Sequence, residues 1–380
     1  MADKENCVRI TRGMKRKAVA AGMESAPLPP PPPPPRKKRV ALGEISNSSS
    51  VLGERQVEVE AKSKKRKSGK GVKKALVLVE EEGGRVSWSK AGVRDESAAK
   101  RDDLRMCAAY VSDIYDYLKD MEMRSGKQAL PDYLEKVQKD LSANMRGILV
   151  DWLVEVSEEY KSLPDTLHLA ISYVDRYLSL HAVSRTQLQL LGVASMLIAS
   201  KYEEIRPPNV DDFCYIADYT YNKQQVVKME ADVLKSLDFE ISRPTTKTFL
   251  RIFTTFVQAK LKAPNLQFEF LGCYLAELSL LDYGCLKFLP SLVAASVIFL
   301  ARFTIWPMAH PWCLELQENT GYRPSELKTC VHIVQGLQLS KAGASLVAIR
   351  EKYNQHNFKL VASLTSFPKI PDSYFEDLEK

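Results

Sequence analysis

The side chains that could carry out acid–base, nucleophilic or metal chemistry do not form a catalytic group in this chain. Adjacent carboxylates occur at Glu158-Glu159 and Glu203-Glu204, but neighbours on a helix point in different directions and cannot form a facing acid–base pair. No GxGxxG or GxxxxGKS/T motif is present to hold a phosphate. The sequence therefore predicts a chain with no enzymatic activity of its own and no metal or cofactor.

The histidines and cysteines support the same interpretation. The histidines show no HExxH spacing, no grouping with a CxxC pair and no serine elbow nearby. The seven cysteines are odd in number and without a CxxC pair, which is typical of reduced thiols that pack as small core residues. We expect the histidines to be core or surface residues; they are His168, His181, His310, His332 and His356.

The charges and the prolines divide the chain into a basic tail and a slightly acidic remainder. Residues 1–100 carry 23 basic and 12 acidic residues, eight of the twenty prolines and one aromatic residue, Trp88, whereas residues 101–380 have a net charge of −4. A segment with so few large apolar residues cannot bury enough surface to offset the entropy of ordering its backbone. We expect residues 1–100 to be disordered.

Two basic runs in the tail predict transport to the nucleus. Such runs suit an import receptor or nucleic-acid phosphates, because both recognise dense positive charge. Specific nucleic-acid binding would need interleaved aromatic residues or a folded element, so we expect an import receptor, with a merely solvated charge run as the alternative. The two runs are Arg36, Lys37, Lys38 and Arg39, and Lys64, Lys65, Arg66 and Lys67.

The apolar segments predict neither secretion nor a membrane span. The start of the chain has no apolar stretch of the length that a secretory signal needs. The longest apolar stretch, residues 286–301, is interrupted by a lysine, a proline and two serines, which leaves it short of the roughly 18 continuous apolar residues of a span. We expect synthesis in the cytoplasm, a nuclear location and no membrane contact.

From residue 102 onward, apolar residues recur with the period of a helix, which predicts an all-α fold. One amphipathic helix, residues 102–121, precedes two sets of five, and residues 242–244 separate the sets. The spans expected are 142–160, 165–180, 185–202, 210–216 and 222–237, and then 246–261, 266–281, 290–303, 311–318 and 324–339. Ser142, Asp165 and Asn222 stand at N-cap positions. Two consecutive sets of equal size indicate a duplicated helical domain.

The helix that contains residues 145–156 is apolar on two sides. Met145, Ile148, Leu149 and Trp152 lie on one side, and three aliphatic residues lie on another. Such a helix either lies at the centre of a domain or serves core and partner together. Arg146 needs a carboxylate partner, because an unpaired guanidinium among apolar residues is costly to desolvate.

These residues carry a resemblance to a known family. The run at 145–161, MRGILVDWLVEVSEEYK, resembles the signature that opens the cyclin box of A-type cyclins, and residues 175–178 and 197–205 follow in family order. The valines at positions 150 and 154 resemble the A class, whereas B-type cyclins tend to have isoleucine there. The tail and the lead-in at 133–140 are most similar to plant A-type cyclins.

The resemblance implies two tandem five-helix cyclin-box folds with a flanking N-terminal helix, preceded by a disordered basic tail. It divides the chain into a regulatory tail (1–100), an N-terminal helix with its lead-in (101–141), an N-terminal box (142–241), a C-terminal cyclin fold (242–345) and an extension (346–380).

The resemblance also implies a protein-kinase partner. Such a chain binds the catalytic subunit of a cyclin-dependent kinase and favours its active state without supplying a catalytic atom. Lys201 and Glu230 match the family residues that hydrogen-bond around the mobile regulatory helix of the kinase. The other kinase-binding positions implied are Tyr202, Phe239, Tyr110, Ile114, Glu203 and Glu204.

A second surface implied by the family is a groove that docks RxL-type motifs of substrates and inhibitors. There Glu155 would pair with the basic residue of the motif, while apolar residues receive its leucine. The groove matches Met145, Ile148, Leu149, Trp152, Glu155, Leu188 and Gln189. The resemblance also pairs Arg146 with Asp175 inside the fold. Gly147 departs from the alanine usual in the family and costs about 0.5–1 kcal/mol in a helix interior.

The tail contains two motifs that the family uses for destruction. Residues 39–47 fit the destruction box RxxLxxxxN, with Arg39, Leu42 and Asn47 at the defining positions, and Lys4-Glu5-Asn6 spells a KEN box. Both lie in chain expected to be disordered, as a degron must be for a ubiquitin ligase to hold it in extended form. We expect a ubiquitin ligase of the anaphase-promoting type as a partner and destruction during the cell cycle.

One alternative function belongs to a different class. Duplicated cyclin folds also occur in transcription initiation factors, which bind DNA and protein without a kinase. The basic tail is compatible with that role, but the net charge of −4 over residues 101–380 is not typical of a DNA-binding fold. A test of whether the chain associates with a kinase or is retained on DNA at physiological salt would discriminate these two functions.

Overall fold

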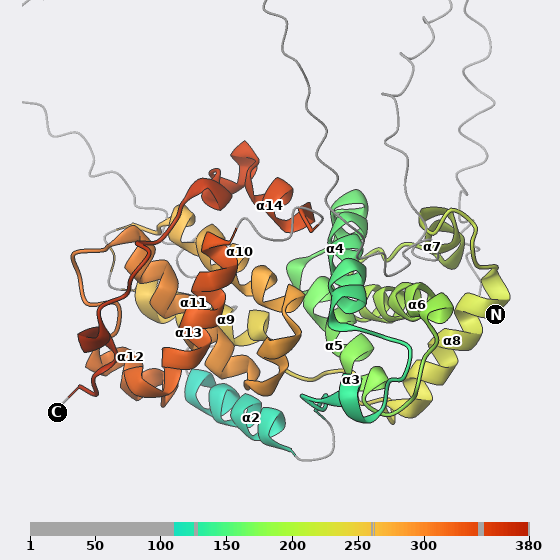
Figure 1. Cartoon of the computed structure of the whole chain (residues 1–380), viewed down its shortest axis with the longest axis horizontal. Helices are drawn as coiled ribbons and strands as arrows, with labels where there is room; N and C mark the ends of the chain where they lie inside the picture. Colours follow the sequence, from blue (N-terminus) through green and yellow to red (C-terminus); the bar gives the residue numbers. More distant parts are fainter. Residues whose placement is uncertain (1–109, 125–127, 260, 262, 341–345, 379–380) are drawn as a thin grey trace, which may run out of the picture. The chain divides into compact units, whose positions relative to one another are not determined.

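The computed structural model describes residues 110–124, 128–259, 261, 263–340 and 346–378, which belong to one compact unit (Figure 1). In these ranges the backbone forms α-helices and short 3-10 helices and no strand, which confirms the all-α prediction. No helix in the described ranges is long and apolar enough to cross a bilayer. The predictions for the KEN box at 4–6, the destruction box at 39–47, the basic runs at 36–39 and 64–67 and the disordered tail lie outside the described residues.

Two sets of five helices follow a flanking helix, α2 (Val111–Met123), and a short turn, α3 (Tyr133–Lys136). The first set is α4 (Ala143–Tyr160), α5 (Pro164–Leu178), α6 (Arg185–Glu203), α7 (Val210–Ile216) and α8 (Lys223–Ser236). The second set is α9 (Thr246–Gln258), α10 (Leu266–Leu281), α11 (Pro290–Ile305), α12 (Leu314–Thr320) and α13 (Pro324–Leu339). The remaining elements are η4 (Tyr283–Lys287), α14 (Ala348–Tyr353), η5 (His356–Phe358), η6 (Val361–Ser363) and η7 (Asp372–Phe375).

Local sequence explains where these helices begin. The Ser142 hydroxyl accepts the Met145 N–H at 3.3 Å and starts α4. Asn222 and Gln225 form a reciprocal capping box at the start of α8. The N-cap prediction for Asp165 is wrong, because Pro164 occupies the first position of α5 and moves the cap to Leu163.

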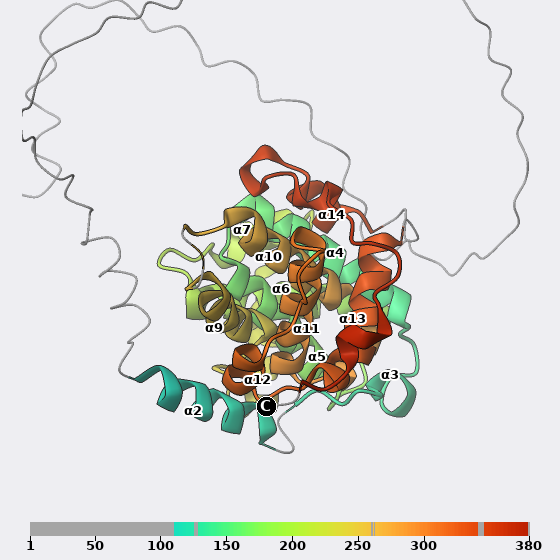
Figure 2. The ribbon, with the colours of Figure 1, turned by 90° about the vertical axis from the view of Figure 1, so that its left-hand side faces the viewer.

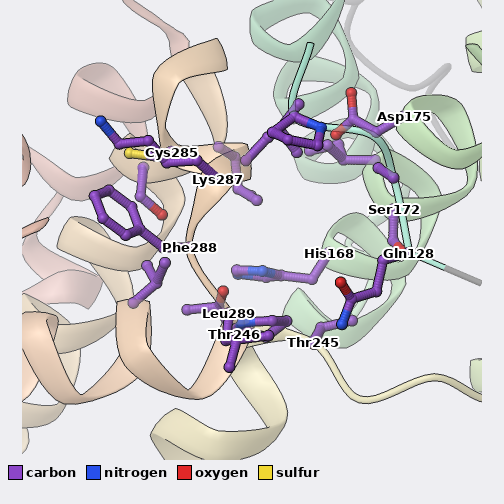
Figure 3. Close-up of a pocket in the computed structure, with 18 of the residues that line it drawn as sticks. Gln128, His168, Ser172, Asp175, Thr245, Thr246, Cys285, Lys287, Phe288 and Leu289 are labelled. Carbon is purple, nitrogen blue, oxygen red and sulfur yellow. The ribbon is translucent and has the colours of Figure 1, made fainter. Parts of the chain in front are cut away.

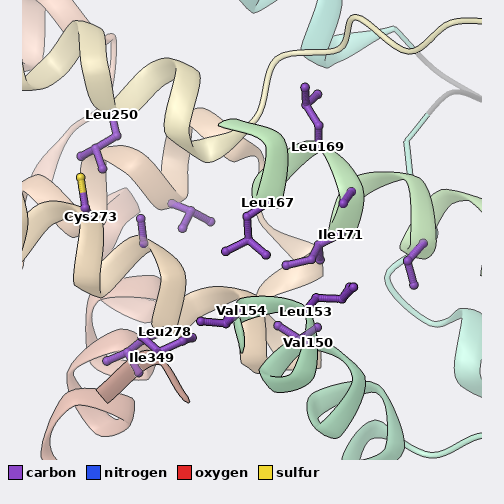
Figure 4. Packing of buried hydrophobic residues seen from close by; sticks show 14 of the residues in the cluster. Val150, Leu153, Val154, Leu167, Leu169, Ile171, Leu250, Cys273, Leu278 and Ile349 are labelled. Atoms are coloured by element: carbon purple, nitrogen blue, oxygen red, sulfur yellow. The ribbon is translucent and has the colours of Figure 1, made fainter. Parts of the chain in front are cut away.

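Each set surrounds one long buried helix. α6 packs against α4, α5, α7 and α8, and its residues from 188 to 200 are all buried. α11 packs against α9, α10 and α13. α4 contacts helices of both sets and α14 as well. Figure 4 shows Val154 of α4 beside Leu278 of α10 and near Ile349 of α14, in a core that is continuous between the two sets.

The flanking helix α2 is anchored on the second set. The Tyr115 hydroxyl donates to the Thr320 carbonyl oxygen at 2.8 Å. The carboxylate of Glu122 is buried and accepts the Ser291 N–H at 3.0 Å, and Lys119 Nζ lies 2.9 Å from the same carboxylate. Figure 2 shows α2 running beside α12. Its outer face is therefore left to solvent.

Candidate protein-binding surfaces

The exposed surface around the ends of α6 and α8 holds the predicted kinase-binding residues of the first set. Lys201 Nζ at the end of α6 lies 2.6 Å from Glu230 Oε1 on α8. Tyr202 follows with 48% of its surface exposed, and Phe239 beyond α8 is 66% exposed. Large aromatic side chains left in water beside an ordered ion pair are typical of a protein-binding surface.

The backbone that presents Phe239 is strained. Asp238 and Phe239 both have positive φ, 53° and 58°. A non-glycine residue in the left-handed region costs about 1–2 kcal/mol. Hydrogen bonds from Phe239 N to the Leu234 carbonyl at 2.9 Å and from Ile241 N to the Phe239 carbonyl at 3.0 Å hold the turn. The chain thus maintains an unfavourable conformation that points an aromatic ring outward.

The residues at the end of α6 and just after it differ in exposure. Ile205 is 99% exposed, which the sequence analysis missed because one isoleucine beyond a helix end has no periodicity to mark it. Glu204 Oε1 accepts from Leu163 N at 2.7 Å and from Thr166 Oγ1 at 2.6 Å, so this oxygen fixes the start of α5. Glu203 is half-buried, and burial together with nearby Asp165 raises its pKa.

The outer face of α2 carries the other predicted kinase-binding residues. Tyr110 and Ile114 are exposed on the same face as Tyr117, which the sequence analysis did not single out. The opposite face holds Tyr115 and Glu122 against the second set. Anchoring on one face leaves a row of apolar side chains on the other.

The residues of the predicted docking groove differ in exposure. Met145, Leu149, Leu188 and Gln189 are buried, and Leu149 and Leu188 belong entirely to the core. The reason is the close approach of α4 and α6: a Cβ added at Gly192 would come within 2.8 Å of Leu149 Cδ1. The other three members of the predicted set reach the surface: Ile148 and Trp152 are half-buried and Glu155 is exposed.

Arg146 is buried and finds a carboxylate. Its Nε and Nη2 each lie 2.7 Å from an oxygen of Asp175, and its Nη1 donates to the Leu280 carbonyl at 2.7 Å. The Tyr133 hydroxyl donates to the same carboxylate at 2.9 Å. Burial opposes the charge, but the Asp175 carboxylate outweighs burial and raises the guanidinium pKa. Next to it, a Cβ at Gly147 would lie 3.2 Å from Leu346 Cδ1, which accounts for the glycine.

Comparison with known proteins identifies the family. Residues 113–242 match the cyclin N-terminal domain, and residues 244–367 match the cyclin C-terminal domain. A G2/mitotic-specific cyclin C13-1 of Daucus carota is 54% identical over 346 residues, 90% of this chain and 96% of that protein. Cyclin-A3-4 of Arabidopsis thaliana is 49% identical over 383 residues, 100% of this chain and 98% of that protein.

The solved structures agree on the fold. A viral cyclin from herpesvirus saimiri has a TM-score of 0.53 with 20% identity, and the match covers 62% of this chain and 99% of that one. Cyclins are regulatory subunits of kinases rather than catalysts, which agrees with the missing catalytic motifs in the sequence. On its two matched domains and its full-length relatives, the chain belongs to the cyclin family and, within it, to the plant A-type cyclins.

Proposed function

We propose that this cyclin activates a cyclin-dependent kinase by binding it through the surface around Lys201 and Glu230. The observation that carries the proposal is the combination of that ordered ion pair with the exposed rings of Tyr202 and Phe239. The two rings offer apolar anchors, which usually dominate interface energies, and the charged pair fixes orientation.

Activation then follows from differential binding. A kinase whose regulatory helix exchanges between an outward and an inward position is shifted to the inward one by a partner that binds only that state. Tyr110 and Ile114 on α2 extend the contact. The cyclin contributes positioning of the kinase residues, and the chemistry stays with the kinase.

The test is phosphorylation of a histone peptide by a purified cyclin-dependent kinase that is inactive alone, with and without the full chain. Lys201→Ala with Glu230→Ala should lower the stimulation about tenfold or more, equivalent to about 1.4 kcal/mol of binding. The matched control is Lys223→Ala with Asp211→Ala, another exposed ion pair of the first set, at 3.1 Å. Full stimulation by the Lys201/Glu230 variant would remove this interface from the mechanism.

We further propose that the surface of Ile148, Trp152 and Glu155 docks RxL-type substrates and inhibitors. Two half-buried apolar side chains beside an exposed carboxylate suit a motif that combines a leucine with a basic residue. Leu149 and Leu188 then support this surface from beneath.

For the tail, we propose nuclear import through its basic runs and destruction by a ubiquitin ligase of the anaphase-promoting type through the motifs at 39–47 and 4–6. The support is the sequence pattern. Together these proposals describe a nuclear regulator whose amount, and therefore whose kinase activity, changes through the cell cycle.

A further inference from the structure

A cavity of about 250 Å³ lies at the junction of the two boxes. Its walls come from α5, from the linker before α9, and from the segment that joins η4 to α11 (Figure 3). This volume is slightly below the usual range of small-molecule sites, about 300–1,000 Å³, so it suits a small ligand. The cavity is separate from both proposed protein-binding surfaces.

One buried polar side chain in this cavity has no hydrogen-bond partner. His168 of α5 is 3% exposed, and its Nδ1 is buried without a partner in the structure. Figure 3 shows the ring projecting toward Leu289 and Thr246 on the opposite wall. Burial and the positive charges of Lys247 and Lys352 lower its pKa to about 3, so the ring is neutral and has one N–H to donate. Buried polar groups are rarely left unpaired without a role.

The cavity also has a positive character. Arg176 and Arg243 line it, are buried, and donate to the main-chain carbonyls of Glu240 and Met121 at 2.9 and 2.7 Å. Burial, and next the charge of Arg243, lower the pKa of Arg176 to about 10, and Tyr173 and then Glu240 offset part of this lowering. An anion between the two guanidinium groups would relieve it further.

Two helix N-termini add to the positive electrostatic character of the cavity. α9 begins at Thr246 and α11 at Pro290, and both positions line the cavity. The acidic side chains of the lining already have donors: Asp175 is bound by Arg146, Glu122 by Ser291, and Asp282 by Gly284. Glu122 shows that the start of α11 accepts an anionic group within this fold.

We propose that the cavity binds a small phosphate ester, with its phosphate between the start of α9 and the guanidinium groups of Arg176 and Arg243 and its apolar part against Phe288 and Leu289. A doubly charged phosphate matches two guanidinium groups better than a carboxylate does. His168 donates a hydrogen bond to the ligand. Because the cavity is bounded by both boxes, the ligand would stabilise their junction. The proposal does not depend on kinase activation.

The test is calorimetric titration of the full chain with phenyl phosphate, and with phenol and inorganic phosphate as partial ligands. We expect one saturable site with a Kd of about 1 mM or tighter, and binding at least about fivefold weaker for each partial ligand. His168→Phe keeps an aromatic ring and removes the donor, and should weaken binding about tenfold. Lys287 is an exposed residue of the cavity lining, and Lys287→Ala, which removes its positive charge, should weaken binding about threefold.

The matched control is His332→Phe, an exposed histidine on α13, which should bind phenyl phosphate as the unchanged chain does. Circular dichroism shows whether the His168 variant keeps its helices, and the Lys287 variant keeps the test open if it does not. No saturation up to about 10 mM would overturn the site. Affinities of both cavity variants equal to that of the unchanged chain would overturn it as well. Phenol or inorganic phosphate binding as tightly as phenyl phosphate would overturn the ligand class.

Discussion

A single buried ion pair connects three helices of this cyclin. Arg146 on α4 binds Asp175 on α5 and the Leu280 carbonyl on α10, so one guanidinium touches both boxes. Desolvating such a pair costs nearly as much as its attraction returns, so its contribution to stability is small while both partners are present. What it fixes is the orientation of α4 between the boxes.

Further along α4, burial disfavours the charged form of Asp151, whereas the charged form of Arg146 is favoured by its partner. It is buried, and its Oδ1 accepts the Ala348 N–H at 3.0 Å, which joins α4 to the start of α14. Burial is the main reason that its pKa rises from 3.8 to about 6, although the hydrogen bond from Ala348 favours the charged form. The folded state therefore takes up this proton more readily than the unfolded state.

This difference predicts a pH-dependent gain for Asp151→Asn. Between pH 4 and 6 the folded chain binds more protons at this site, so the stability of the unchanged chain falls as pH rises through that window. Asparagine keeps an acceptor for the Ala348 N–H without the charge. We expect the variant to be more stable by about 1–2 kcal/mol at pH 7.5 and by almost nothing near pH 4, measured by urea unfolding at both values. A gain of equal size at both pH values would contradict the assignment.

At the scale of elements, α2 depends on a small polar network. Glu122 accepts from Ser291, and Lys119 Nζ reaches both the Glu122 carboxylate and the Tyr322 hydroxyl, the latter at 2.9 Å. These bonds act beside the apolar packing of Leu118 and of the Tyr115 ring, which lies against Phe249 and Phe253. We infer that the network sets the angle at which α2 presents its outer face.

Glu122→Ala should release α2 while leaving the boxes folded. The change leaves the Ser291 N–H at the start of α11 without its acceptor and removes the carboxylate partner of half-buried Lys119, which together cost about 2–4 kcal/mol. We expect hydrogen exchange of residues 111–123 to accelerate strongly while α6 and α11 stay protected. Asp120→Ala, an exposed change on the same helix, is the control and should leave exchange unchanged. Retained protection of α2 in the Glu122 variant would show that packing alone holds it.

The proposed docking surface on α4 gives the second prediction at this scale. Trp152→Ala should lower kcat/KM about tenfold for substrates that carry an RxL motif and leave a short histone peptide unaffected, because only the former use the surface. Leu180→Ala removes an exposed apolar side chain two residues beyond the end of α5 and serves as control. Equal losses on both kinds of substrate would mean that Trp152 acts through the core.

The helical periodicity of the sequence was enough to predict the long helices, but it was not enough to predict which of their residues lie at the surface. The two sets of five helices lie within a few residues of their expected spans, because each carries a run of apolar residues at helical spacing. α3 and α14 were missed, since four and six residues are too few to show a period. For α4 the sequence left two interpretations open, because burial of Leu149 depends on how closely α6 approaches, which one helix alone cannot reveal.

At the scale of the whole molecule, the two cyclin boxes share one continuous core, whereas the charge of the chain is concentrated in the tail. Residues 1–100 carry 23 basic and 12 acidic residues and are therefore strongly positive, while the rest of the chain has a net charge of −4. The proposed kinase-binding surface lies in the folded part, whereas the motifs proposed for import and destruction lie in the tail. Changes in the tail should therefore alter location and lifetime without altering kinase activation.

This separation predicts the outcome of changing the destruction box. Arg39→Ala with Leu42→Ala removes two of the three side chains that define the motif at 39–47. If a ubiquitin ligase binds the motif as proposed, it loses its anchor and the half-life in mitosis should lengthen severalfold. The measurement is the decay of the full chain after synthesis is blocked in synchronised cells. Arg36→Ala with Leu28→Ala removes the same residue types outside the motif and should decay as the unchanged chain does. Stimulation of the kinase should be equal in all three proteins, and an unchanged half-life in the first variant would reduce the motif to a chance match.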